Sequence, residues 1–105
     1  MTETADIILN WLKEEFPKGA WAAQEIPTYN YVSSKQEVIE TMSAVIGGIT
    51  LELKVNKDLA VEIWTKTPFK RSSKVREVHL QDPTSIEDLQ EVVKHTIKIT
   101  TNPYL

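Results

Sequence analysis

A basic segment with an aromatic residue at its centre is the strongest chemical feature of the sequence. Residues 66–80 hold five of the 12 basic residues and one acidic residue, in a chain whose formal net charge is −3. Charge segregation of this kind is typical of an interaction surface. We therefore take residues 66–76 (the basic segment), together with the tryptophan that precedes them, as the candidate binding site. Its residues are Trp64, Lys66, Phe69, Lys70, Arg71, Lys74 and Arg76.

Three interpretations of the basic segment are open. Cations that contact phosphates, together with aromatic rings on which bases stack, are typical of single-stranded nucleic-acid or RNA binding. The same residues would suit an acidic protein partner. A solvated loop that pairs with the acidic remainder of the chain, or that protects a strand edge from aggregation, is the structural alternative. The net negative charge disfavours nucleic acid, because the other faces of the molecule would repel phosphates.

A second pattern, Glu52-Leu53-Lys54 on a predicted strand, is typical of the end of a metal-dependent nuclease motif. In such a motif a carboxylate holds Mg²⁺ and the lysine assists the attacking water. The expected strand register places Glu62 directly opposite Glu52, so that two carboxylates share a face. The motif also needs an acid on the preceding strand, and residues 41–51 contain none. Glu37 and Glu40 are displaced from that position unless residues 38–46 form the paired strand. Glu-x-Lys is equally ordinary in an amphipathic strand, where Lys54 would offset Glu62.

The other polar residues indicate no catalytic or cofactor site. The chain has no cysteine, so disulfides, thiol nucleophiles and thiolate metal sites are excluded. His95 follows Glu91 by four residues on a predicted helix, and His79 shares a strand face with Glu77, so neither has the partners of a zinc site. Phosphate-loop, dinucleotide-binding and Gly-x-Ser-x-Gly motifs are absent from the sequence. We therefore expect a non-catalytic protein without a cofactor.

A hairpin over residues 49–66 is the clearest predicted element. Apolar and polar residues alternate along both of its strands, which is typical of strands with one buried and one solvated face. This alternation places Val55 and Leu59 on the same face, at either side of the turn. The predicted loop is therefore Asn56-Lys57-Asp58, whose Asn and Asp tolerate left-handed geometry. The exposed face of the hairpin would carry Glu52, Lys54, Glu62, Trp64 and Lys66.

An amphipathic helix is predicted near the start of the chain. Apolar residues recur with three- and four-residue spacing from Ala5 to Phe16, which places them on one helix face. Either Thr2 or Thr4 can cap the helix, and Pro17 ends it.

A strand over residues 74–80 and a second helix complete the predicted C-terminal part. The helix begins at Thr84 or Ser85, because each is followed three residues later by an acid. Asn102-Pro103 ends it. Its core-facing residues are Ile86, Leu89, Val92, Val93, Thr96 and Ile97.

The region between the first helix and the hairpin is less regular. A short edge strand is predicted near residues 28–32, because Pro27 is tolerated only at a sheet edge or in a loop. Residues 34–46 fit a helix that begins with a capping box at Ser34, and they also fit a strand by alternation. We favour the strand, because another strand follows at once through Gly47-Gly48.

Three aromatic residues, Trp21, Tyr29 and Tyr31, flank the predicted edge strand. Aromatic residues are enriched at binding hot spots, and they also fill small cores. We assign Trp21 to the core and leave Tyr29 and Tyr31 open between the two roles. A homodimer is a further open alternative, because an exposed edge strand can pair with a second copy.

The 105 residues are predicted to form a single α+β domain. We expect a two-layer sandwich, in which N-terminal and C-terminal helices cover a mostly antiparallel sheet of three to five strands. No apolar stretch is long enough to span a membrane, and residues 1–16 do not resemble a secretory signal. We therefore expect a cytoplasmic protein without a membrane partner.

The expected function is that of a small interaction or regulatory module. It would bind a protein partner through the exposed sheet face and the basic segment. Nucleic-acid binding by the same segment is the alternative, and a metal-dependent nuclease that uses Glu52 and Lys54 is the third hypothesis. The sequence shows no resemblance that assigns it to a family.

Overall fold

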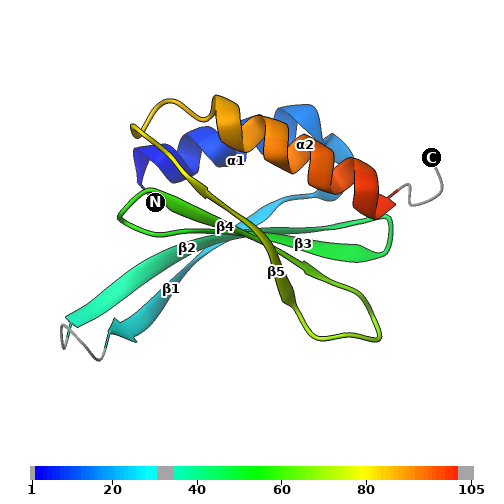
Figure 1. Cartoon of the computed structure of the whole chain (residues 1–105), viewed down its shortest axis with the longest axis horizontal. Helices are drawn as coiled ribbons and strands as arrows, with labels where there is room; N and C mark the ends of the chain where they lie inside the picture. Colours follow the sequence, from blue (N-terminus) through cyan, green and yellow to red (C-terminus); the bar gives the residue numbers. More distant parts are fainter. Residues whose placement is uncertain (1, 31–34, 102–105) are drawn as a thin grey trace.

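The computed structural model is an α+β sandwich of two helices and a five-stranded antiparallel sheet, as the sequence predicts (Figure 1). It describes residues 2–30 and 35–101, and the side chains of residues 2–24 and 39–99. The elements are helix α1 (Glu3–Glu15), the short 3-10 helix η1 (Pro17–Gly19), strands β1 (Ala22–Asn30), β2 (Lys35–Ile46), β3 (Ile49–Val55), β4 (Ala60–Lys66) and β5 (Ser73–His79), and helix α2 (Glu87–Thr101).

The sheet is a meander in which each strand pairs with the next one along the chain, in the order β1-β2-β3-β4-β5. Both helices lie over the same face of the sheet (Figure 1), which we call the helix face. None of the described elements covers the opposite face, which we call the open face. An antiparallel sheet commonly has one packed and one solvated face, because the side chains of each strand alternate between them.

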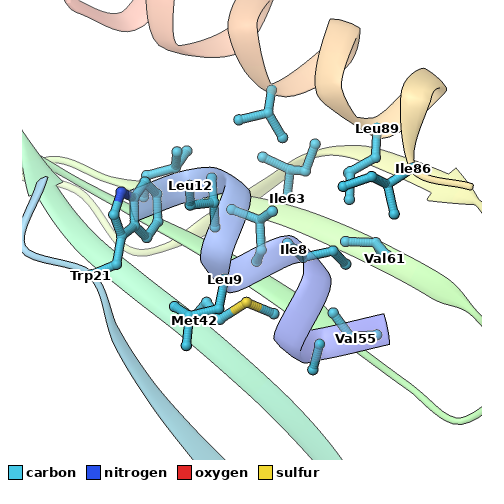
Figure 2. Packing of buried hydrophobic residues seen from close by; sticks show 14 of the residues in the cluster. Ile8, Leu9, Leu12, Trp21, Met42, Val55, Val61, Ile63, Ile86 and Leu89 are labelled. Carbon is cyan, nitrogen blue, oxygen red and sulfur yellow. The ribbon is translucent and has the colours of Figure 1, made fainter. Parts of the chain in front are cut away.

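The core lies between the helices and the helix face. Figure 2 shows α1 contributing Ile8 and Leu12, α2 contributing Leu89, and the sheet contributing Met42 and Ile63. Full burial of each such side chain contributes about 1.5–3 kcal/mol. The two helices are therefore held to the sheet by one cluster of apolar side chains.

The start of α1 is attached to the sheet by a buried carboxylate. Thr2 is the helix cap, since its Oγ1 accepts a hydrogen bond from the Ala5 N–H at 3.3 Å. Glu40 of β2 accepts from the Thr2 N–H at 2.7 Å and from the Thr2 hydroxyl at 2.9 Å. Thr4 instead donates its hydroxyl to the Pro83 carbonyl at 2.8 Å, so of the two predicted caps it is Thr2 that caps the helix.

The two uncertain segments of the N-terminal half are both strands. β1 is an edge strand, and it begins at Ala22, well before the predicted residues 28–32, of which residues 31 and 32 lie outside the described residues. β2 confirms the strand prediction for residues 34–46 from Lys35 onward. Gly47 and Gly48 form the turn that follows, with φ of 60° and 80°. Positive φ at both central residues suits a two-residue hairpin turn.

Trp21 lies in the core, as predicted, and its Nε1 donates to the Phe16 carbonyl at 3.2 Å. The side chains of Tyr29 and Tyr31 lie outside the described side chains, so their predicted alternatives are not resolved by the structure.

The predicted register of the β3–β4 hairpin was wrong by two residues. Val55 pairs with Val61 and not with Leu59. The Asn56 side chain accepts from the backbone N–H groups of Asp58 and Ala60 at 2.9 and 3.0 Å. Leu59 takes the left-handed conformation, with φ of 63°. A two-residue shift keeps every side chain on its face, so alternation alone could not detect it.

The helix α2 begins at Glu87 and not at Thr84 or Ser85. Thr84 and Ser85 instead form a turn with Asp82, whose carboxylate accepts hydrogen bonds from the backbone N–H and the hydroxyl of both residues at 2.8–3.0 Å. The Thr84 N–H, followed by the Ser85 hydroxyl, lowers the pKa of Asp82 below its ordinary value of 3.8. The predicted core-facing residues of α2 are buried or half-buried, while Asn102-Pro103 lies outside the described residues.

Candidate functional site

Five side chains of β3, β4 and β5 form a connected group on the open face, which we call the open-face cluster. Lys54 Nζ lies 4.4 Å from the centre of the Trp64 ring, and Trp64 Nε1 donates to Glu62 Oε1 at 2.9 Å. Lys74 Nζ lies 3.8 Å from Glu62 Oε2 and 3.9 Å from Glu77 Oε2. Lys74 thus pairs with both of two carboxylates, Glu62 and Glu77, that the register places directly opposite each other.

Lys74 belongs to the open-face cluster because β5 contains a bulge. Ile63 pairs with Arg76, but Trp64 pairs with Lys74, which leaves Val75 as an extra residue in β5. A bulge changes which side chains share a face beyond it. Lys74 therefore joins Trp64 on the open face, whereas Arg76 lies with Ile63 on the helix face.

The loop between β4 and β5 carries an exposed aromatic residue among cations. Phe69 is 96% exposed. The backbone turns there, with the Lys70 N–H donating to the Thr67 carbonyl at 3.3 Å. Within the described part of the chain, Lys66, Lys70 and Arg71 form no ion pair. In Figure 1 this loop points away from the helices, at the lower right. We call Lys66, Phe69, Lys70 and Arg71 the basic tip.

The structure therefore divides the seven predicted site residues into three groups. Trp64 and Lys74 belong to the open-face cluster, Arg76 lies on the helix face, and the other four form the basic tip. Glu77 is a further member of the open-face cluster that was not predicted from the sequence, where it only shared a strand face with His79. Its role depends on facing Glu62 across the β4–β5 pair, which only the register shows.

Among the described side chains, the nuclease pattern has no acid on the preceding strand that shares a face with Glu52: residues 38–46 are part of the paired strand β2, but Glu40 lies opposite Val55 on the helix face. Glu52 faces Ser43 on β2 and Trp64 on β4, and the expected pairing of Glu52 with Glu62 was wrong. Glu52 and Glu62 are not opposite each other because the register of the β3–β4 hairpin differs by two residues from the predicted one. Among the side chains that the structure describes, no group of three or more histidine, aspartate or glutamate residues could hold a metal ion.

Comparisons of the chain with protein-family models, with curated proteins and with solved structures give no match. Neither described helix is both long enough and apolar enough to cross a membrane. The function must therefore be inferred from the residues and contacts given above.

Proposed function

We propose that this chain is a non-catalytic binding module that engages a protein partner through the open-face cluster and the basic tip, in the cytoplasm. The observation that carries the proposal is Phe69, 96% exposed at the end of a hairpin loop. Lys66, Lys70 and Arg71 surround it in the sequence, without an ion pair among the described residues. An aromatic anchor beside unpaired cations suits an acidic surface with an apolar pocket.

Burial of a phenylalanine side chain contributes about 1.5–3 kcal/mol, which corresponds to about ten- to a hundredfold in affinity. The cations of the basic tip add steering of an acidic partner. Among the described residues, these cations have no ion pair to break before they act, whereas Lys74 would first have to leave Glu62 and Glu77. The basic tip is therefore the part of the surface that is ready to bind.

Nucleic-acid binding by the same segment is the alternative function. Lys74 is paired with two carboxylates and Arg76 lies on the helix face, so three of the five predicted cations remain at the tip. Three phosphate contacts to a single strand would give a slope of about −2 in a plot of log affinity against log salt. The carboxylates of the open-face cluster would repel the regularly repeated phosphates of a strand beside the tip, whereas a protein partner can place neutral or basic side chains there, which favours a protein partner.

The test combines partner capture with a nucleic-acid titration. Proteins that cross-link to the chain are captured with the wild type, with Phe69→Ser and with a Lys66/Lys70/Arg71→Ala triple variant. The matched control is Lys13/Lys94/Lys98→Ala, which removes the same charge from exposed positions of the helices. We expect one protein to be captured by the wild type and the control but not by the two tip variants, and to bind the wild type when purified.

Fluorescence anisotropy with labelled single-stranded DNA, duplex DNA and RNA over a salt series decides between the two functions. We expect no binding at the micromolar level. Micromolar binding with a salt slope of about −2, lost in the tip triple variant and kept in the control, would establish the alternative instead. Captured proteins that do not depend on the basic tip would contradict both.

A further inference from the structure

A groove lies between β5 and α2 on the helix face, at the edge of the sheet. Its volume is about 150 Å³, and it is lined by Val75, Arg76, His95, Thr96 and Ile99. Val75 is 44% and Ile99 56% exposed. Two of the few exposed large apolar side chains in the described part of the molecule therefore line the same groove.

The bulge in β5 creates this groove. Adjacent residues of a regular strand point to opposite faces, yet Val75 and Arg76 both line the groove. Val75 is the extra residue between the two registers of the β4–β5 pair. Bulges commonly re-aim a side chain in this way next to functional sites. The groove thus combines an apolar side chain with a neighbouring cation.

The backbone beside the groove is free to pair. β5 is the last strand in the sheet order, so one of its edges has no neighbour among the described strands. The Leu80 N–H donates to the Leu59 carbonyl at 2.9 Å, toward β4. Because N–H groups of an antiparallel strand alternate in direction, those of Glu77 and His79 point to the free edge. An extended peptide can add to such an edge by backbone hydrogen bonds.

The charge of the groove selects among such peptides. Arg76 forms no ion pair within the described part of the chain, and Lys70 and Arg71 lie in the loop that leads into β5. A carboxylate on the added strand would face Arg76, and an apolar side chain on the same strand would lie against Val75 and Ile99.

We propose that the edge of β5 and the β5–α2 groove accept an extended segment of a protein partner as an additional strand of the sheet, with an acidic and an apolar residue two positions apart on the face that meets the groove. This inference rests on the proposed function and names the form in which the partner binds. Backbone pairing with Glu77 and His79 holds the segment, while Val75, Ile99 and Arg76 select its side chains. Charges and bulges also protect sheet edges from aggregation, and the experiment separates that role from binding.

The experiment is a selection of displayed random peptides, each long enough to pair with the seven residues of β5, on the wild-type chain. We expect enriched peptides in which an Asp or Glu and an apolar residue are two positions apart, because residues at this spacing lie on the same face of a strand. Their synthetic forms should protect the amides of Glu77 and His79 from hydrogen exchange. Val75→Glu and Arg76→Glu should each weaken binding by about tenfold or more, a change of about 1.4 kcal/mol.

The matched control is Val45→Glu, which places the same new charge at an exposed valine on β2, away from the groove. This variant should bind the selected peptides as the wild type does. If Val75→Glu does not fold, Arg76→Glu and peptides methylated at their backbone nitrogens give the same information, because methylation removes the donors that strand pairing needs.

Failure of the selection to enrich any peptide, or binding that none of these changes weakens, would overturn the inference. So would dimerisation of the wild-type chain that Val75→Glu abolishes in analytical ultracentrifugation, since a second copy would then occupy the edge. A captured partner that depends on Phe69 but not on Val75 would keep the proposed function and remove only the groove. A partner that depends on neither would contradict both.

Discussion

Single residues in this protein often act through contacts with distant parts of the chain. Glu40 is 6% exposed and lies on the helix face of β2, opposite Val55. A buried carboxylate is costly unless it is hydrogen-bonded. Here the backbone N–H and the hydroxyl of Thr2 satisfy it, and the positive end of α1 stabilises its charge. Glu40 therefore links the first helix to the second strand.

We expect Glu40→Gln to lower the free energy of unfolding by about 1–2 kcal/mol, because hydrogen bonds to a charged group and its interaction with the helix dipole are weakened. Urea unfolding followed by circular dichroism measures this loss. Glu52→Gln is the matched control on the open face, and it should change stability by no more than about 0.5 kcal/mol. Equal effects of the two substitutions would show that Glu40 does not anchor α1.

At the scale of elements, the turns determine which strand residues face each other. The β2–β3 turn keeps Ile46 opposite Ile49 through two glycines with positive φ. The β3–β4 loop instead uses the Asn56 side chain and a left-handed Leu59. The second arrangement moves Trp64 opposite Glu52 and Glu62 opposite Lys54, which produces the open-face cluster.

We expect Gly48→Ala to destabilise the protein by about 1–2 kcal/mol, because a β-carbon strains a left-handed backbone. Gly48 has φ of 80°, and an added Cβ would meet nothing within 4 Å, so steric contact does not contribute. Gly48→Asn should cost less than Gly48→Ala, since asparagine tolerates this conformation better. Thermal unfolding of the three proteins tests the order. An alanine variant as stable as the glycine protein would contradict the turn geometry.

At the scale of the whole chain, helices from opposite ends of the sequence share one core. Thr4 of α1 also donates to the Pro83 carbonyl in the turn before α2. The two helices and the sheet bury one cluster of apolar residues. We propose on this basis that the chain folds as one cooperative domain.

We expect Leu12→Ala in α1 and Leu89→Ala in α2 each to lower the free energy of unfolding by about 2–5 kcal/mol, because both side chains are fully buried. In each variant, tryptophan fluorescence and far-ultraviolet circular dichroism should report the same transition midpoint. Phe69→Ala is the control, and it should change stability by no more than about 0.5 kcal/mol. Separate transitions for the two signals would show that the helices unfold independently.

Local patterns in the sequence already determined the first helix, the two strands of the β3–β4 hairpin and the two-layer arrangement. Alternation along residues 49–66 predicts two strands with one solvated face, and the spacing from Ala5 to Phe16 predicts a helix with one apolar face. Elements of this kind can bury their apolar faces only against one another. The fold class, the core position of Trp21 and the solvated face that carries Trp64 follow from such patterns.

Only the tertiary structure decided which residues face each other. Alternation has a period of two, so it cannot distinguish the predicted pairing of Val55 with Leu59 from the observed pairing with Val61. Backbone bonds between distant residues produce the bulge at Val75 and the separation of Arg76 from the basic tip. They also place Lys74 where it pairs with both Glu62 and Glu77. Contacts of that kind leave no periodic signal in the sequence, and they determine the candidate binding surfaces.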